Sequence, residues 1–167
     1  AREAISESGA TPLTREEWLS TTAGFNDINV SSWMWGGQYA AEDDAVVAGG
    51  IRTWTSVISP EQMFGYAGSE CGAMPEIGAS FYNRINNNDW RKLAFVAPEG
   101  TPLSGQEPFL DPEFAATYFD GPYIAIKFRP GQGNMEDPNV GAVVGYPMMR
   151  VEEMYFIEAE ATAHQNP

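Results

Sequence analysis

The chain has 167 residues, of which 43% are hydrophobic and 13% aromatic, so it holds enough apolar material to bury a core of its own. Nine Lys and Arg residues stand against 23 Asp and Glu residues, which gives a formal net charge of −14. Nucleic-acid binding and docking on anionic lipid are excluded, because both need clustered cations and this sequence offers none. The charge is compatible with an uncharged ligand such as a neutral sugar, but it does not indicate one.

The single cysteine, Cys71, excludes a disulfide within the chain, and we interpret it as a buried or loop thiol. No run approaches the roughly 18 apolar residues that a membrane span needs. Residue 1 is not Met, and residues 1–9 read like the tail of a helix that closes on Gly9. We therefore expect an internal piece of a longer protein, whose missing N-terminal part carries any export signal and lipid anchor.

The first half of the chain predicts short elements separated by loops. Thr14 is followed three residues later by Glu17, which is the pattern of a capping box and predicts a short helix. Residues 28–39 hold several aromatic side chains and a pair of glycines, so we expect an extended segment that turns at the glycines. An acidic loop is expected over residues 40–50, and a helix over residues 75–86.

The second half is poorer still in helix signals. Four prolines within residues 97–120 indicate an irregular loop. Residues 123–128, with the sequence Tyr-Ile-Ala-Ile-Lys-Phe, give the clearest strand of the chain. Residues 129–146 are again expected to be loop, because they are rich in Gly, Asn and Asp.

The end of the chain, residues 147–161, predicts a helix with an apolar face. Pro147 suits the first turn of a helix. Apolar side chains then recur at three- and four-residue steps, at Met148, Val151, Tyr155 and Ala159.

This run resembles the C-terminal helical signature of the SusD/RagB family, the surface glycan-binding lipoproteins of Bacteroidetes. The family pattern reads roughly Pro-apolar-apolar-Arg-x-x-Glu-apolar-x-apolar-x-x-Ala-Glu-Ala, and it is matched by Arg150, Glu153, Ala159, Glu160 and Ala161. A second stretch, residues 80–85 followed by residues 89–92, resembles the family's tyrosine-bearing helix and the Asp-x-Arg element after it, here Asp89 and Arg91. The order and separation of the two stretches also fit the family.

The resemblance implies a mainly α fold, the tetratricopeptide-like helical scaffold of the SusD type, with long irregular loops and a few short strands. Residues 1–167 would then be a single fragment of a longer SusD-like domain. The expected segments are a helix, loop and aromatic-rich part (1–92), a loop-rich part with one strand (93–146) and a terminal scaffold helix (147–167).

The resemblance also implies a function without catalysis. The protein would bind an oligosaccharide or polysaccharide at the bacterial cell surface, held to the outer membrane by the lipid anchor of the missing part. It would deliver the glycan to a TonB-dependent outer-membrane transporter of the SusC-like type. No cofactor and no metal are expected.

Proteins recognise sugars by stacking an aromatic ring on the apolar face of a pyranose, so aromatics in loop-like sequence are the candidate contacts. Core packing is the competing interpretation for each of them, most of all for Trp33 and Trp35, which would share one face of a strand. Trp54 and Tyr66 are preferred because glycines lie nearby, and replacement of Trp54 with Ala is expected to weaken glycan retention while leaving the fold intact. The full set of candidates is Trp33, Trp35, Tyr39, Arg52, Trp54 and Tyr66.

The residues of the resemblance itself are interpreted as scaffold rather than as catalytic groups. Arg150 and Glu153 lie three positions apart on the predicted helix, where a guanidinium and a carboxylate can meet or reach a neighbouring helix end. Asp89 and Arg91 are expected to anchor a helix to the loop after it. Glu160 belongs to the same structural set.

Two other functions remain open on the sequence alone. One is a secreted glycoside hydrolase or other carbohydrate-active enzyme, which needs two carboxylates across a cleft, and 23 acidic residues always provide some pair. The other is a structural, lid-like component that contacts the transporter and not the sugar. The only histidine, His164, offers little basis for a triad or a zinc site. Asp43-Asp44 and residues 134–139 are rich in oxygen, but they lack the order of a calcium loop, and solvated loop charge is the preferred interpretation.

Overall fold

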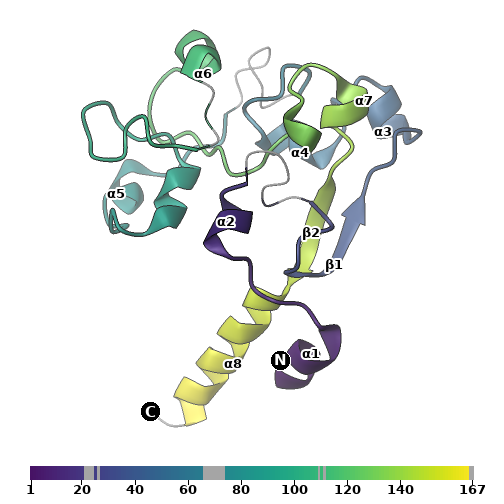
Figure 1. Ribbon diagram of the computed structural model, residues 1–167, viewed down its shortest axis with the longest axis vertical. Helices are drawn as coiled ribbons and strands as arrows, with labels where there is room; N and C mark the ends of the chain where they lie inside the picture. The colour runs from purple at the N-terminus through teal and green to yellow at the C-terminus, as the bar shows by residue number, and fades with distance from the viewer. Residues whose placement is uncertain (21–24, 26, 66–73, 109, 111, 166–167) are drawn as a thin grey trace.

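The computed structural model describes residues 1–20, 25, 27–65, 74–108, 110 and 112–165 (Figure 1). Within them lie eight α-helices, two 3₁₀ helices and two strands, nearly all of them short. In chain order they are α1 (Arg2–Ser8), α2 (Arg15–Trp18), β1 (Trp33–Gln38), α3 (Asp44–Val47), α4 (Trp54–Ile58), α5 (Ala79–Tyr82), η1 (Trp90–Ala94), α6 (Pro112–Tyr118), η2 (Gly131–Gly133), α7 (Pro138–Gly141), β2 (Gly145–Arg150) and α8 (Val151–Gln165).

The predicted mainly α, tetratricopeptide-like scaffold is wrong. Such a scaffold is built from stacked pairs of helices, and each repeat buries its apolar face against the next. Here only α8 reaches 15 residues, and the other α-helices in the described part of the chain have between four and seven. Helices this short present too little apolar surface to pair, so loops and a small sheet form most of the body.

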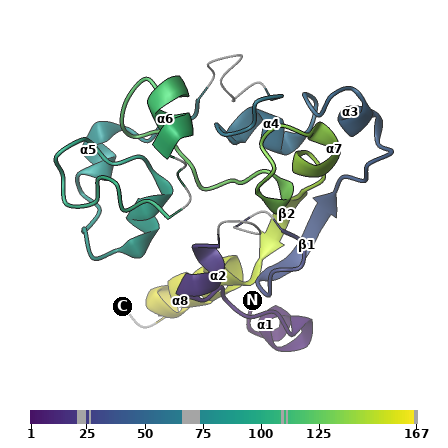
Figure 2. The same ribbon diagram turned by 45° about the horizontal axis from the view of Figure 1, so that its top comes forward.

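Both views place α5 and α6 on one side of the molecule and α3, α4 and α7 on the other (Figures 1 and 2). The sheet lies on the side of α3, α4 and α7, and α8 extends away from the body at its lower end. The N-terminal helix α1 packs beside α8, where Arg2 forms an ion pair with Glu158. As predicted, α1 ends on Gly9 in the left-handed conformation, at φ 66°.

Strands β1 and β2 form a two-stranded antiparallel sheet. Gly36 lies opposite Pro147 and Gly37 opposite Tyr146, so the predicted turn at the glycines is wrong. The aromatic rings of Trp33 and Tyr146 occupy the space that a Cβ on these glycines would need. The glycines therefore let two large rings lie flat on the sheet.

Residues 123–128 do not form the strand that their pattern predicts. Only isolated antiparallel bridges join Ile124 to Glu76 and Ala125 to Phe95. Phe95 directly follows η1, and Glu76 lies shortly before α5. Both partner segments are therefore too short to continue into a β-ladder. The alternation still holds: Ile124 and Ile126 are 2% and 0% exposed and form the centre of the main apolar cluster.

The same bridges shorten the helix predicted over residues 75–86. The backbone of Pro75 accepts a hydrogen bond from the N–H of Ala125, and the N–H of Ile77 donates to the carbonyl of Tyr123. These residues are therefore extended, and the helix is confined to α5.

The terminal helix begins later than predicted. Residues 145–150, including Pro147, belong to β2, and α8 starts at Val151. Proline lacks the N–H that a central strand donates, but a two-stranded sheet has only edge strands, where this is tolerated. The N–H of Val151 then donates to the carbonyl of Ser32, 2.9 Å away, and fixes the start of the helix against the sheet.

Candidate functional site

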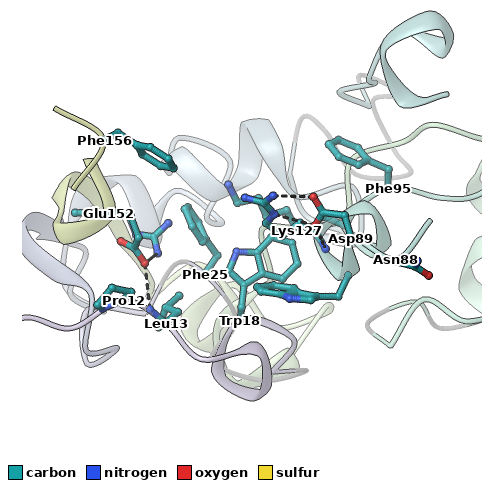
Figure 3. A pocket seen from close by; sticks show the side chains of 14 residues that line it. Pro12, Leu13, Trp18, Phe25, Asn88, Asp89, Phe95, Lys127, Glu152 and Phe156 are labelled. Atoms are coloured by element: carbon teal, nitrogen blue, oxygen red, sulfur yellow. Dashed lines mark hydrogen bonds and ion pairs between the residues drawn. The ribbon is translucent and has the colours of Figure 1, made fainter. Parts of the chain in front are cut away.

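A pocket of about 630 Å³ lies between α2, η1, the end of β2 and the first turns of α8. Figure 3 shows Phe25 and Trp18 in its middle, Glu152 and Phe156 on the α8 side, and Asp89, Asn88 and Phe95 on the opposite side. The lining residues come from four distant parts of the chain: Pro12, Leu13, Trp18, Phe25, Asn88, Asp89, Trp90, Arg91, Ala94, Phe95, Lys127, Arg150, Glu152 and Phe156.

Aromatic rings supply most of the apolar wall. Trp18 and Trp90 meet edge to face, with centroids 5.0 Å apart and an angle of 74° between their planes. Phe25 is buried, whereas Phe156 on α8 is 70% exposed at the rim. The pocket thus combines fixed rings at its base with an accessible ring at its edge.

The capping box predicted at the start of α2 is confirmed, and it positions Trp18. The Thr14 hydroxyl accepts from the N–H of Glu17 at 3.2 Å, and the Glu17 carboxylate accepts from the N–H of Thr14 at 2.8 Å. The hydrogen bond from the Thr14 N–H is the main cause that lowers the pKa of Glu17. Because α2 has only four residues, we expect its cap to contribute to holding the indole in the wall, together with the packing of Trp18 on Trp90.

Asp89 and Arg91 form one wall of the pocket. The two oxygens of Asp89 accept from Nε and Nη2 of Arg91, at 2.9 and 2.7 Å, and Asp89 also caps η1 by accepting from the N–H of Arg91. The hydrogen bonds from the guanidinium lower the pKa of Asp89 and raise that of Arg91. The pair is a bidentate fork that remains charged across the whole neutral range.

Arg150 and Glu152 lie on the facing side. The guanidinium donates to Oγ of Ser32 at 2.9 and 3.1 Å and to Oε1 of Glu152 at 2.7 Å. The same Glu152 oxygen accepts from the N–H of Leu13 at 3.1 Å, which ties α8 to the segment before α2. Burial is the main cause that lowers the pKa of Arg150, and Glu152 opposes it.

Lys127 is the third cation, and its environment is different. Its Nζ lies 3.5 Å from the ring centre of Phe25 and 5.2 Å from that of Phe128. None of the hydrogen bonds or ion pairs among the described residues involves this ammonium. Burial lowers its pKa to about 8, and the nearby charge of Arg150 adds to the effect while Glu152 opposes it. The guanidinium carbon of Arg150 lies 3.8 Å from the same ring centre, so the ring of Phe25 contacts two cations.

The structure does not bring the predicted glycan contacts into this pocket. The hydroxyl of Tyr39 accepts from the N–H of Trp54, and both rings pack with Tyr146, while Trp54 also meets Phe128 at 4.8 Å. Trp54 is therefore part of a half-buried aromatic cluster, and its replacement with Ala removes packing as well as an aromatic surface.

The other candidates are scattered. Trp33 is half-buried over the sheet, and Trp35 is 61% exposed, because the irregular register at this point of β1 separates their faces. Arg52 is exposed between α3 and α4. Tyr66 lies outside the described residues. Glycan binding by these residues stays a prediction.

The residues that carry the SusD/RagB resemblance fall into two groups, those that line the pocket and those that do not. Asp89, Arg91 and Arg150 all line the pocket. Glu153 does not reach the guanidinium of Arg150, and its carboxylate instead accepts from the N–H of Arg150 at the start of α8, 3.1 Å away. Glu160 is exposed near the end of α8, opposite His164.

Sequence reasoning missed the pocket's main contributors, Trp18, Phe25, Trp90, Lys127 and Phe156. The sequence prediction favours aromatics in glycine-rich stretches, and no glycine lies within five positions of Trp18, Trp90 or Phe156. One local signal was present, since Trp90 stands between the two residues of the Asp-x-Arg element. The remaining signals are non-local and need the fold.

The described part of the chain holds no group of three or more His, Cys, Asp or Glu residues arranged to bind a metal. The oxygens of residues 134–139 serve the backbone: Asn134 accepts from the N–H groups of Glu136 and Asp137, and Asp137 accepts from that of Asn139. None of the described helices is both long enough and apolar enough to cross a bilayer.

No family model, curated protein or solved structure matches the chain. The likeness to the SusD/RagB family therefore rests on the residues of the two short stretches and stays a prediction.

Proposed function

We propose that this protein binds an oligosaccharide or polysaccharide in the pocket between η1 and α8 without cleaving it. The observation that supports this is the combination of aromatic walls with hydrogen-bonding groups held in place by their own partners. A pyranose has an apolar face for a ring such as Phe156 and hydroxyls for side chains such as Asn88 and Arg91. The volume of about 630 Å³ suits a few sugar units.

The wider role follows the SusD/RagB resemblance. The glycan would be captured at the bacterial cell surface, by a protein anchored in the outer membrane through a lipid, and passed to a TonB-dependent transporter. This part of the proposal is supported by the Arg150 and Asp89 stretches of the sequence and awaits its own test by co-purification with the transporter.

Binding is favoured over hydrolysis by the state of the two carboxylates that line the pocket. A glycosidase needs one carboxyl group with a raised pKa to act as the acid. The hydrogen bonds from Arg91 lower the pKa of Asp89, which suits it poorly for that task. Glu152 already accepts hydrogen bonds from Arg150 and from the backbone of Leu13. Both carboxylates are thus committed to holding the pocket together.

The test is retention on gels that contain a panel of polysaccharides, with a reducing-end assay on the same mixtures. Phe156→Ala is the informative variant, because the ring is 70% exposed and its loss should leave the fold intact. Trp35→Ala is the matched control, since this ring is 61% exposed but lies on the sheet. We expect Phe156→Ala to weaken retention about tenfold, within the range for removing an aromatic stacking contact, and Trp35→Ala to leave it unchanged.

Weaker retention by Trp35→Ala together with unchanged retention by Phe156→Ala would place the site on the sheet and overturn the assignment of the pocket. Release of new reducing ends would replace a binding protein with an enzyme. Failure to retain any polysaccharide would contradict the proposed function as a whole and favour a protein that contacts only the transporter.

A further inference from the structure

The charge of the pocket differs from that of the chain around it. Over the whole sequence, acidic residues outnumber basic ones by 23 to 9. Among the residues that line the pocket, three are basic, Arg91, Lys127 and Arg150, and two are acidic, Asp89 and Glu152. The pocket therefore carries a formal charge of 3 − 2 = +1 within a protein of net charge −14. One third of all the cations of the chain gather at this one place.

Two of the three cations are neutralised within the pocket. Arg91 is held by both oxygens of Asp89, and Arg150 is held by Glu152 and Ser32. The ammonium of Lys127 is different, because its contacts in the described part of the structure are with the rings of Phe25 and Phe128. The unbalanced positive charge of the pocket thus resides on Lys127.

An ammonium that is half-buried and forms no ion pair with the described residues is costly for the fold, and the lowered pKa of Lys127 expresses that cost, which the nearby charge of Glu152 only opposes. An uncharged side chain of similar length would fill the same space next to Phe25 without this cost in stability. Charged groups held at the expense of stability are typical of binding sites, where the ligand provides the missing partner.

We propose that the glycan bound in this pocket is acidic, and that its anionic group, a uronate carboxylate or a sulfate ester, pairs with Lys127. This rests on the proposed function of the pocket. A single negative charge matches the formal +1 of the lining, and both groups carry one. Arg91 and Arg150 retain further N–H donors beyond those given to their carboxylates, so they are suited to bind the remaining oxygens.

The net charge of −14 makes the proposal sharply testable. A protein this acidic repels a polyanion at long range, so retention of an acidic glycan at low salt requires a local site and cannot come from general attraction. Binding without a local site would instead favour the neutral polysaccharides over the acidic ones.

The experiment compares polysaccharides that differ only in their charged group. Polygalacturonate is paired with its carboxyl-reduced form, and dextran sulfate with dextran. We expect the natural chain to prefer the charged member of one pair by about tenfold, the effect of one charge-assisted contact. The pair that shows the preference identifies the carboxylate or the sulfate as the group recognised.

Two variants locate the effect. Lys127→Met keeps the length of the side chain without its charge, and it should bind both members of the pair equally while still retaining the neutral one. Lys127→Arg keeps the charge, and it should restore the preference for the acidic member. Circular dichroism of both variants confirms that the fold is retained.

The possible failures are distinguishable. In one outcome the natural chain retains the charged and neutral members equally, and Phe156→Ala retains neither. This would overturn the proposal that the ligand is acidic and leave glycan binding in place. A preference that survives in Lys127→Met would place the anionic group elsewhere and also overturn the inference. Retention of none of the four polysaccharides, nor of any member of the wider panel, would remove the proposed function together with this inference.

Discussion

Single residues in this protein take roles that only the fold assigns. The sequence alone predicts that Arg150 lies on one helix with Glu153 and meets it or a neighbouring helix end. In the structure it ends a strand, its side chain is 11% exposed, and its guanidinium contacts Ser32, Glu152 and the ring of Phe25. A spacing of three residues predicts an ion pair only if both residues are helical, and here Arg150 is not.

Lys127 yields a prediction about stability and pH. Its pKa is about 8 in the folded protein against 10.5 ordinarily. Between these values the unfolded chain binds more protons than the folded one, and stability then rises with pH. Below about pH 8 the charge is present in both states and its desolvation weakens the fold. Lys127→Met should therefore be more stable than the natural chain at neutral pH, and the difference should shrink as the pH rises towards 10.5.

Urea unfolding of both chains over this pH range provides the measurement. At each pH, the free energy of unfolding of the natural chain is subtracted from that of Lys127→Met. This difference removes the titration of every group that the two chains share. The charged neighbours do not reverse the sign: Arg150 lowers the pKa of Lys127, Glu152 opposes it weakly, and the Asp89–Arg91 pair keeps its charges throughout. A difference that stays constant with pH would show that Lys127 titrates normally.

Secondary-structure elements were predictable where their signals are local. The capping box of α2 and the glycine that ends α1 involve residues within one turn of each other, and both were found from the sequence. Residues 75–86, 123–128 and 145–150 were not predicted correctly. Each of these segments is shaped by a partner far along the chain, through the bridges at Ile124 and Ala125 or the pairing of β2 with β1.

The candidate site was even less predictable, for the same physical reason. Its two acid–arginine pairs are local in sequence, and the Asp-x-Arg stretch drew attention to one of them. The association of Trp18 with Trp90 joins segments 72 residues apart, and that of Phe25 with Lys127 and Arg150 joins segments more than 100 residues apart. No periodicity in a single segment carries that information.

The cap of α2 yields a prediction at the scale of the element. Thr14→Ala removes the acceptor for the N–H of Glu17 and should lower the free energy of unfolding by about 1 kcal/mol. Because α2 carries Trp18 into the pocket wall, we also expect a change in tryptophan emission and weaker glycan retention. Thr11→Ala, outside the helix, is the control: its hydroxyl makes no hydrogen bond among the described residues, and the change should have little effect.

An unfolding midpoint for Thr14→Ala that equals that of Thr11→Ala would show that α2 is held by the packing of Trp18 and not by its cap. In that case the retention of glycan should also be unchanged, since the indole would keep its place beside Trp90.

At the scale of the whole molecule, a buried ion pair connects distant parts of the chain. Glu61 and Arg129 form an ion pair of 2.6 Å, and their side chains are only 1% and 8% exposed. Burial lowers the pKa of Arg129, and the charge of Glu61 opposes that change. The pair connects the segment after α4 with the one before η2, so it joins two segments that lie outside the sheet.

This pair yields a prediction for the whole fold. Glu61→Gln leaves a buried guanidinium without its countercharge and should cost about 3–5 kcal/mol of stability. Replacing both residues with Met should cost less than either single change, because no uncompensated charge remains. Arg2→Gln breaks the exposed ion pair with Glu158 and should cost less than about 1 kcal/mol in the same urea titration. Equal effects of Glu61→Gln and Arg2→Gln would show that water reaches Glu61 and Arg129.

The direct passage from β2 into α8 has a mechanical consequence. No loop separates Arg150 from Val151, and Val151 is fully buried, so the helix is joined to the sheet as a rigid arm about 22 Å long. The first turns of this arm carry Glu152 and Phe156, which form one side of the pocket. The opposite side, at η1, belongs to a different part of the body. The angle between α8 and the sheet at this junction therefore determines how far Glu152 and Phe156 stand from η1, and the contacts of α8 with Leu13 and α1 hold that angle in place.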